Sequence, residues 1–481
     1  MIKIKTISLL FMALLFTGCL DNTNMQKQFR QNRQIRYRNQ FSTRPDRQGN
    51  SAGEIESLAF VDGIYSINDC LLSALENNKD IKNAYFRQDQ AKGQKIEAIS
   101  TALPKASLNF DGLDVDTELP GDGSNYNGQL RVSQPLYLGG LIGTALDAAK
   151  AFDFLTSQEL RLAIQQVHLH VQTSYLNVLL AKELVQVARQ DLANAKELLI
   201  DTQKKYKYGA ARKFDVLRSE VRVKTLAAEL VKQQNACEVA MTVLYNAMGV
   251  SQNSKIELSD KLKFESVDVV IDKCNELALT RRAELLMGEA NIRLAEDNVI
   301  SKQAGNKPNV FLVGSYQQSY PGFMSFTGAG ADWDRTGTVG VSMQWPFFSG
   351  FQVRGQVLQA KAVLQQQRVA LVKTEQQVQL EVTQALLNLK NNKEFVLSQD
   401  GNVQNAQEAL RLVKVDYREG VATSLDVINS QLALAQAQKD YYNAVQAYQV
   451  SLLDLHAAIG TIGEDNLPIE KNESTNIEVN K

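Results

Sequence analysis

The stretch YREGVATSLDVINSQ, from Tyr417 to Gln431, and its earlier counterpart YKYGAARKFDVLRSE, from Tyr206 to Glu220, decide the fold. A shift of 211 residues places one stretch on the other. The same shift pairs further identical residues of the two halves: Pro135 with Pro346, Gly139 with Gly350, Lys150 with Lys361 and Gly249 with Gly460. The chain is therefore an internal duplication.

Each of the two stretches predicts the tip of a helical hairpin. A long helical pattern stops at Gly209 in the first and at Gly420 in the second, and glycine accepts the left-handed conformation that ends a helix. An apolar-periodic segment then resumes with an aspartate in its opening turn, Asp215 or Asp426. Two helices are thus expected to meet at a tight turn, twice.

Composition favours long helices over one compact core. Aromatic residues make up only 7% of the 481 residues, whereas Ala, Gln, Leu and Val fill the long middle segments. The formal net charge is −1, so no global field argues for a nucleic-acid partner or a strongly acidic one.

The first residues predict an exported lipoprotein. Residues 1–18 have a basic start, a short apolar run and small residues before Cys19, as a cleaved signal peptide does. The residues LFTGC resemble the bacterial lipoprotein box, although Phe16 stands where that pattern usually has leucine. The resemblance implies a covalent lipid such as palmitate on Cys19, and Leu20 after it implies sorting to the outer membrane. An ordinary cleaved signal with an incidental cysteine is the alternative.

Residues 19–59 predict a polar tether, because they contain too few apolar residues to order themselves. The arginine-rich part, residues 27–47, either spaces the lipid from the body or binds lipid head groups or peptidoglycan. The polar tail, residues 464–481, is expected to be disordered. The three remaining cysteines give no disulfide framework and are expected to be buried free thiols: Cys70, Cys237 and Cys274.

Two repeats follow the tether, residues 60–260 and 261–463. Each opens with apolar residues at helical spacing over about two helices, followed by Pro104 or Pro308. A shift of 204 residues aligns these openings and pairs Cys70 with Cys274.

After each of these prolines the apolar period changes from 3.6 to 2. Near residue 106 an apolar face alternates with a polar one: Ala106, Leu108 and Phe110 against Ser107, Asn109 and Asp111. A turn-rich loop and a second alternating run follow, and the second repeat does the same with NVFLVGSY and GTVGVSMQW. Each repeat therefore predicts a β-hairpin with one apolar face.

Strands of this length and alternation are typical of bilayer-spanning sheets, although two soluble hairpins packed on a helix would share the pattern. Aromatic residues near the strand ends suit an interfacial belt: Tyr126, Tyr137, Tyr316, Tyr320, Trp333 and Trp345. The smallest membrane barrels need about eight strands, and an open edge in lipid costs several kcal/mol for each unpaired amide. Four spanning strands would therefore require a barrel shared among copies of the chain, and three copies would supply about twelve.

The segments from Leu141 to Lys207 and from Phe351 to Arg418 lack proline and keep a helical pattern, which predicts helices of about 100 Å. Return helices are expected from about Lys213 to Met248 and from about Ser424 to Ile459. Because these are shorter, the opening helices are expected to complete the return path.

This duplicated order of helix, hairpin, very long helix, tip and return helix resembles the TolC family of outer-membrane efflux channels over residues 60–463. The tips carry the resemblance, as Tyr-x-x-Gly followed by Asp-Val-Leu or Asp-Val-Ile. So do the hairpin ends: Gln134, Pro135, Leu136, Tyr137 and Gly139 with Pro346, Phe347, Phe348 and Gly350.

The resemblance implies a mainly α fold with a small β part. As a homotrimer the chain would form a twelve-stranded transmembrane β-barrel continued by a periplasmic α-helical barrel. It would sit in outer-membrane lipid as a passive exit duct, docked to a periplasmic adaptor and, through it, to an inner-membrane pump. No phosphate-binding loop, nucleophile motif or metal-ligand cluster is evident in the sequence, so no enzyme, cofactor or metal is expected.

The resemblance also assigns roles to the tips. Asp426 and Asn429 match positions that line the narrow end of the family's tunnel, although Asn429 departs from the acidic pattern. Three copies of Asp426 would form a carboxylate ring that attracts cations. The alternative is a local role in which Asp426 stabilises its helix start, with Thr423 as N-cap. Both roles are compatible.

The first tip is mainly basic and the second mainly acidic. This difference suggests salt bridges between neighbouring hairpins, and the alternative is that the charges are only solvated. The candidates are Arg212, Lys213, Asp215 and Arg218 in the first tip and Asp416 and Glu419 in the second. The small turn residues are adaptor-contact candidates by the resemblance: Gly209, Ala210, Ala211, Gly420, Val421 and Ala422. The rival function is a lipid-anchored periplasmic scaffold without a pore. The exported solute is not indicated.

Overall fold

The computed structural model describes residues 63–115, 123–254, 256–267, 269, 271–320 and 333–462. The chain divides into two units, residues 1–56 and residues 57–481, and the description below concerns the second alone. The signal peptide, Cys19, the tether, both hairpin loops and the tail lie outside the described residues and stay predictions.

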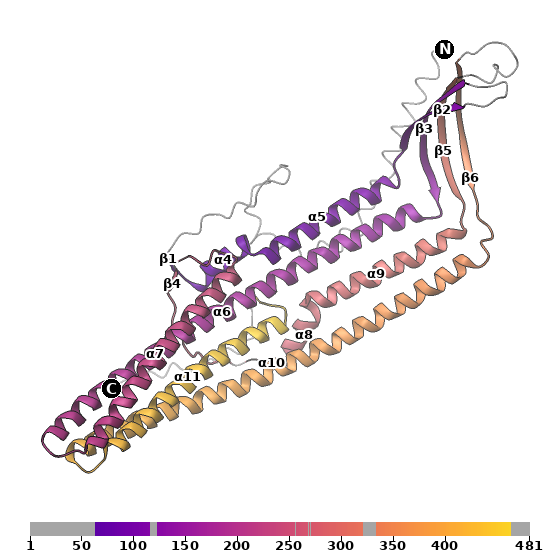
Figure 1. Cartoon of the computed structure of the whole chain (residues 1–481). Coiled ribbons are helices and arrows are strands. Elements are labelled where there is room, and N and C mark those ends of the chain that lie inside the picture. Colours follow the sequence, from indigo (N-terminus) through magenta and orange to yellow (C-terminus); the bar gives the residue numbers. More distant parts are fainter. Residues whose placement is uncertain are drawn as a thin grey trace, which may run out of the picture. The chain divides into compact units, whose positions relative to one another are not determined.

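Four helices form the two hairpins that the sequence predicts: α6 (Leu141–Lys207) with α7 (Lys213–Met248), and α10 (Gln352–Glu419) with α11 (Ser424–Ala458). The bounds of α6 and α7 coincide with the prediction, and those of α10 and α11 differ from it by one residue. At 1.5 Å a residue, α6 and α10 are each about 100 Å long. Figure 1 shows both hairpin tips at the end of the unit opposite to the sheet.

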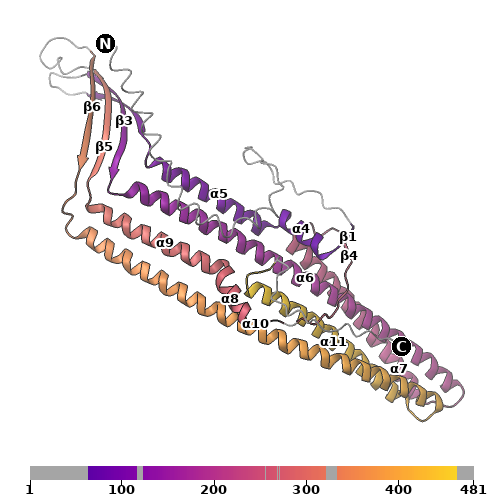
Figure 2. The same ribbon diagram turned by 180° about the vertical axis from the view of Figure 1, so that it is seen from behind.

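The opening helices form two matched pairs: α4 (Ile67–Asn77) with α5 (Lys79–Ser100), and α8 (Ile271–Arg281) with α9 (Ala283–Gln303). A 3-10 turn, Ala304–Asn306, extends α9. Both pairs end a few residues before their proline. α5 and α9 lie beside the halves of the long helices nearer the sheet, and α7 and α11 beside the other halves (Figure 2). The expected return path is thus confirmed.

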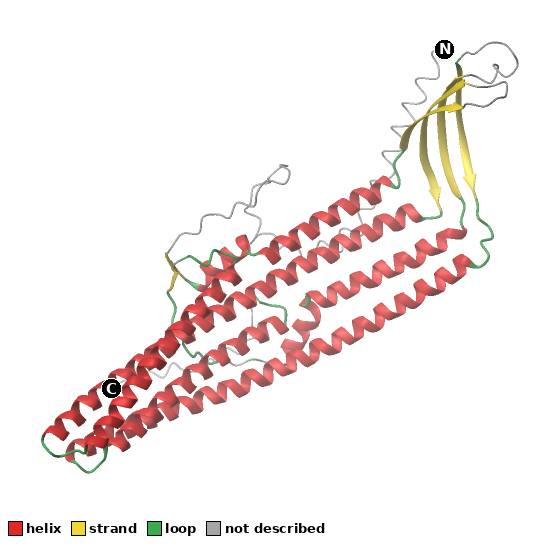
Figure 3. Ribbon diagram, in the orientation of Figure 1, coloured by secondary structure: helices red, strands yellow, loops and turns green. Residues whose placement is uncertain are grey.

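The two hairpins join into one antiparallel sheet of β2 (Lys105–Val115), β3 (Gly123–Leu138), β5 (Asn309–Tyr320) and β6 (Asp334–Gln344), in that order. Figure 3 shows this sheet at one end of the helices. β3 pairs with β5, so the two repeats meet at the sheet centre and β2 and β6 are its edges.

The strand register separates polar from apolar side chains. Opposed residues share a face of a sheet, so each row of partners belongs to one side. One face carries the row Asn109, Gln129, Gln317 and Thr336 and the row Ser107, Arg131, Ser315 and Thr338. The other carries Leu108, Leu130 and Tyr316 in one row and Ala106, Val132 and Val339 in another. The predicted alternation is therefore confirmed in these rows, whereas Phe311 and Val313 at the helix end of β5 lie on the polar face.

The largest core lies where the opening helices meet the return helices. Tyr175 on α6, Tyr448 on α11 and Leu244 on α7 are buried there, together with Cys70 and Cys274. Burial raises the pKa of the Cys70 thiol to about 12. Cys70, Cys237 and Cys274 are free, and the first and last are buried as predicted, whereas Cys237 is half-buried.

A second, two-stranded sheet was not predicted. β1 (Gly63–Tyr65) pairs in parallel with β4 (Ile256–Leu258), which ties the start of repeat one to the linker between the repeats. Nearby, the Tyr175 hydroxyl donates to Asp260 Oδ2 at 2.7 Å. In the described part of the chain, none of the helices combines the length and apolarity that a membrane crossing needs.

Candidate functional site

The two tips use the same backbone turn. Gly209 and Gly420 have φ of +76° and +82°, the left-handed conformation expected of them. The Ala210 N–H donates to the Lys205 carbonyl at 2.8 Å, and the Val421 N–H donates to the Asp416 carbonyl at 2.9 Å. These bonds satisfy a carbonyl in the last turn of each helix. Both tips are therefore closed turns built the same way.

Asp426 makes the predicted capping box with Thr423. Its Oδ2 accepts from the Thr423 N–H at 2.8 Å and from the Thr423 hydroxyl at 2.6 Å, and its N–H donates to that hydroxyl at 3.3 Å. The hydroxyl, then the N–H, lowers the pKa of the Asp426 carboxyl, which keeps it ionised near neutral pH. Asp426 and Asn429 are exposed and stand three residues apart, so they share one helix face.

The first tip has a weaker version of this cap. Asp215 accepts from the Arg212 N–H at 3.3 Å, and its carboxylate lies 3.6 Å from the Arg212 Nε. An arginine side chain has no acceptor, so the reciprocal bond of the capping box is missing. The local role weighed for Asp426 is thus present at both tips and is stronger in the second.

The two tips touch through Tyr417, a contact that sequence reasoning missed. The Lys205 ammonium donates to the Tyr417 carbonyl at 2.6 Å and lies 3.7 Å from the centroid of its ring. The Tyr417 hydroxyl lies 3.4 Å from Thr202 Oγ1. Tyr417 is 9% exposed, whereas Tyr206, its counterpart in repeat one, is 47% exposed. Cations commonly end helices, so nothing in the pattern singled out Lys205.

The charges proposed for bridges between hairpins do not pair across the tips within the described part of one chain. Arg212 pairs with Asp215 of its own tip, and the Arg218 guanidinium lies 4.6 Å from the Phe214 ring centroid. Asp416, Glu419 and Lys213 are exposed. Bridges between neighbouring subunits therefore stay a prediction.

The small residues proposed for adaptor contact form an accessible surface. Gly209, Ala210, Gly420 and Val421 are exposed, and Ala211 and Ala422 are half-buried. A Cβ added at Gly209 or Gly420 would meet no atom within 4 Å. A partner can therefore approach the backbone at both turns.

The sheet at the opposite end is incomplete in a single chain. β2 and β6 each have one neighbouring strand, so the outer backbone groups of both edges lack a strand partner in the described sheet. The apolar face is uncovered, with Leu108 76% and Val339 85% exposed. Five residues of the proposed aromatic belt are likewise exposed: Tyr126, Tyr137, Tyr316, Trp333 and Trp345.

No group of three or more His, Cys, Asp or Glu side chains within the described ranges is placed to hold a metal ion. His168 is partly buried, and burial followed by the charge of His456 lowers its pKa.

Known proteins share this arrangement. The family model "Outer membrane efflux protein" matches residues 71–250 and 275–461. Outer membrane protein TolC of Escherichia coli (strain K12) is 24% identical over 411 residues, 81% of each chain, and the probable outer membrane lipoprotein SilC of Salmonella typhimurium is 21% identical over 395 residues, 80% of this chain and 84% of that one.

The fold also matches solved structures. A crystal structure of CusC superimposes with a TM-score of 0.70 at 18% identity, over 82% of this chain and 92% of that chain. The two family matches cover both repeats separately, in agreement with the duplication seen in the sequence. The chain belongs to the outer membrane efflux protein family.

Proposed function

We propose that three copies of the chain form an outer-membrane channel, the passive exit duct of a tripartite export system. Twelve strands would close a barrel, and the long helices would continue it as a periplasmic tunnel. The observation that carries this proposal is the four-stranded sheet with one apolar face, one polar face and two open edges.

An incomplete sheet of this kind requires partners. In a bilayer each unpaired edge amide costs several kcal/mol, so β2 and β6 must pair with strands outside the chain. Closure by identical copies pairs β6 of one subunit with β2 of the next and removes every edge. The apolar face then meets lipid and the polar face meets water.

The assembly is tested on the full-length protein purified in detergent. Light scattering should give the mass of a trimer, and planar bilayers should show discrete conducting steps. A proline replacing Thr338, near the centre of edge strand β6, removes one backbone N–H from this strand, disturbs its pairing and should weaken the trimer. A monomer that needs no detergent once its lipid is removed would instead be a pore-less scaffold.

At the tips, we propose that Asp426 from three subunits forms a carboxylate ring at the narrow end of the tunnel, with Asn429 one turn further along the same face. Support comes from the exposure of both residues and from the cap that keeps Asp426 ionised. Such a ring attracts cations, and the close approach of like charges disfavours full ionisation.

A matched control separates the effect of the ring from the effect of the helix cap. Asp426→Asn and Asp215→Asn each replace the carboxylate that accepts from the backbone N–H of the N-cap residue, but only the first removes the proposed ring. Asp426→Asn should therefore lower cation preference in bilayers, whereas Asp215→Asn should leave it unchanged. Equal effects of the two variants would refute the ring.

We also propose that the two turns dock a periplasmic adaptor that connects the duct to an inner-membrane pump. The exposed backbone at Gly209 and Gly420 supports close approach. Val421→Trp should reduce co-purification of the adaptor without changing trimer mass. Val239→Trp, also on an exposed site but within α7, should not reduce it.

A covalent lipid on Cys19 would complete the anchoring. The signal sequence with its lipoprotein-like box supports this, and SilC is a relative described as a probable outer membrane lipoprotein. Cys19→Ser should lose the mass of the acyl chains in intact-protein mass spectrometry. If the variant loses no acyl mass, the first residues are an ordinary cleaved signal peptide and Cys19 carries no lipid.

A further inference from the structure

The polar face of the sheet holds its charges in two separate bands. Lys105 and Arg131 lie toward the helices, and Asp111 and Asp334 lie in the row at the other end of the sheet. The rest of this face, as far as the strands are described, consists mainly of hydroxyl and amide side chains. Like charges are therefore grouped along the strands.

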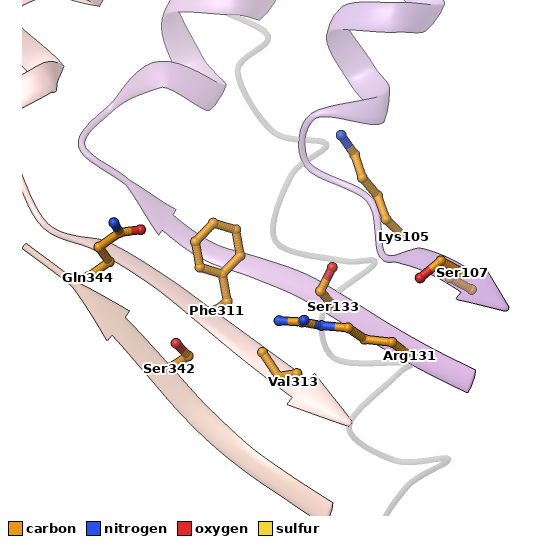
Figure 4. A pocket seen from close by; sticks show the side chains of 9 residues that line it. Lys105, Ser107, Arg131, Ser133, Phe311, Val313, Ser342 and Gln344 are labelled. Atoms are coloured by element: carbon orange, nitrogen blue, oxygen red, sulfur yellow. The ribbon is translucent and has the colours of Figure 1, made fainter. Parts of the chain in front are cut away.

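The two cations stand on neighbouring strands and have no acidic ion-pair partner among the described residues. Lys105 is opposite Ser133, and Arg131 is opposite Ser107, so the cations are diagonal neighbours with Cα atoms about 7 Å apart. Figure 4 shows both over a hollow that is also lined by Ser133, Val313 and Gln344. Both are exposed, and neither makes an ion pair or side-chain hydrogen bond with another described residue.

The acidic band does not neutralise them. Asp111 is four residues along β2 from Ser107, the partner of Arg131, and at about 3.4 Å a residue this places the rows about 14 Å apart. The Debye length is about 10 Å at 0.1 M salt, so interactions over that distance are largely screened. Each band therefore acts on nearby ions separately.

We propose that Lys105 and Arg131 form a cationic band in the wall of the pore and favour the passage of anionic solutes, those bearing carboxylate, phosphate or sulfate groups. This inference rests on the proposed trimer, in which the polar face turns inward. The Arg131 guanidinium supplies several donors in a fixed plane, and the hydroxyls of Ser107 and Ser133 supply further donors to an anion.

Three copies would place six cations around one level of the barrel, where the helices join it. Two charge filters would then act in series along the duct. The carboxylates of Asp426 at the tips would favour cations, and the cationic band at the sheet would favour anions. A solute that carries both signs would meet a favourable field at each level.

The test is the reversal potential of the full-length trimer in planar bilayers, under a KCl gradient of about 10 to about 100 mM, where the Debye length is about 30 to about 10 Å. Lys105→Gln with Arg131→Gln should lower the chloride-to-potassium permeability ratio roughly twofold or more. Asp111→Asn with Asp334→Asn should raise it. Both differences should shrink near 1 M KCl, where the Debye length is about 3 Å.

Two controls separate the band from unrelated effects. Arg335→Gln removes a cation from the opposite face of the same sheet and should leave the ratio unchanged. Lys105→Arg with Arg131→Lys keeps both charges and should also leave it unchanged, because the charge and not the identity of the side chain sets the ratio.

An unaltered ratio in the conducting trimer of Lys105→Gln with Arg131→Gln would overturn the cationic band and leave the proposed channel standing. A wild-type trimer that never conducts would overturn the channel and, with it, this inference.

Discussion

The two repeats differ where each return helix ends against the bend between its two opening helices. In repeat one, α7 ends beside Asn78, whose Nδ2 donates to the Ala247 carbonyl at 2.9 Å. The Asn78 Oδ1 also accepts from the Asp80 N–H at 2.8 Å and so caps α5. One neutral side chain serves two helix ends.

In repeat two the matched residue is Arg282. Its guanidinium donates to the Ala457 and Ala458 carbonyls at 3.3 Å each, to Glu284 at 3.0 Å and to Glu381 at 2.7 Å. The side chain is only 13% exposed. The duplication keeps the position of the capping group and changes its chemistry from a neutral amide to an ion network. Equivalent geometry thus does not imply equivalent energetics.

The largest expected difference follows from this change. Arg282→Ala should lower the free energy of unfolding by about 3 kcal/mol, because it leaves Glu381 and Glu284 without their cation in a partly buried site. Asn78→Ala should lower it by about 1 kcal/mol, the size of a typical hydrogen bond. Denaturant unfolding of the detergent-solubilised protein, followed by helical circular dichroism, measures both.

A double variant identifies the origin of the loss. Arg282→Met with Glu381→Gln removes both charges and should recover part of the stability that Arg282→Ala loses. If Arg282→Ala and Asn78→Ala cost the same, the ion network contributes no more than the neutral cap.

The next difference concerns the glycines that end the return helices. Gly249 and Gly460 have φ of +73° and +71°, so an alanine at either costs about 1 kcal/mol for its backbone conformation. A Cβ at Gly249 would lie 2.7 Å from the Asn77 carbonyl oxygen, whereas one at Gly460 would lie 3.3 Å from the Arg281 backbone. Gly249→Ala should therefore lower the free energy of unfolding by about 1 to 2 kcal/mol more than Gly460→Ala does. The same unfolding measurement applies. A larger loss of stability for Gly460→Ala would contradict the tighter packing inferred at Gly249.

A smaller effect is expected where the sheet passes into the long helices. The residue before α6 is Gly140 with φ of +97°, and its counterpart before α10 is Phe351 with φ of +67°. No atom lies within 4 Å of a Cβ added at Gly140, so Gly140→Ala tests the backbone alone and should cost about 1 kcal/mol.

Phe351 gives the converse comparison. Phe351→Gly should be more stable than Phe351→Ala by about 1 kcal/mol, because only the first relieves the left-handed backbone. Both variants lose the edge-to-face contact with Phe348, so that loss cancels. Equal stability of the two would mean that the strained conformation costs nothing here.

These positions also show why part of the structure could be predicted from the sequence. Helix ends at Gly209 and Gly420 and the cap of Asp426 follow from local rules, and their prediction from the sequence is confirmed. The two faces of the hairpin strands follow from alternation over long runs, whereas the pairing of β3 with β5 was not predicted. Family membership followed from the duplicated order of these elements.

Other features depend on contacts that leave no periodic pattern of apolar residues in the sequence. β1 and β4 have three residues each, too few for an alternation to register. The contact between Lys205 and Tyr417 joins helices of different repeats, and its residues look like ordinary helix-end residues. Phe351 takes a conformation that the glycine rule would assign to glycine. Tertiary packing decides such sites.

A further difference between the repeats concerns pH. Asp297 on α9 stands where repeat one has Gly93, and burial, then repulsion by Asp147 and Glu296, raises its pKa from 3.8 to about 6. Because the folded state binds this proton more tightly than the unfolded state, stability should rise as pH falls from about 7 to about 4. Asp297→Asn should flatten that part of the profile of melting temperature against pH.

Repeat one supplies the matched control for this effect. A Cβ at Gly93 would meet no atom within 4 Å, so a carboxylate placed there stays solvated. Gly93→Asp and Gly93→Asn should therefore have profiles of the same slope between pH about 4 and about 7, because a solvated carboxylate keeps its ordinary pKa. If Asp297→Asn leaves the slope of the wild-type profile unchanged, the Asp297 carboxylate is as well solvated as one placed at Gly93. The buried charge then does not distinguish the two repeats.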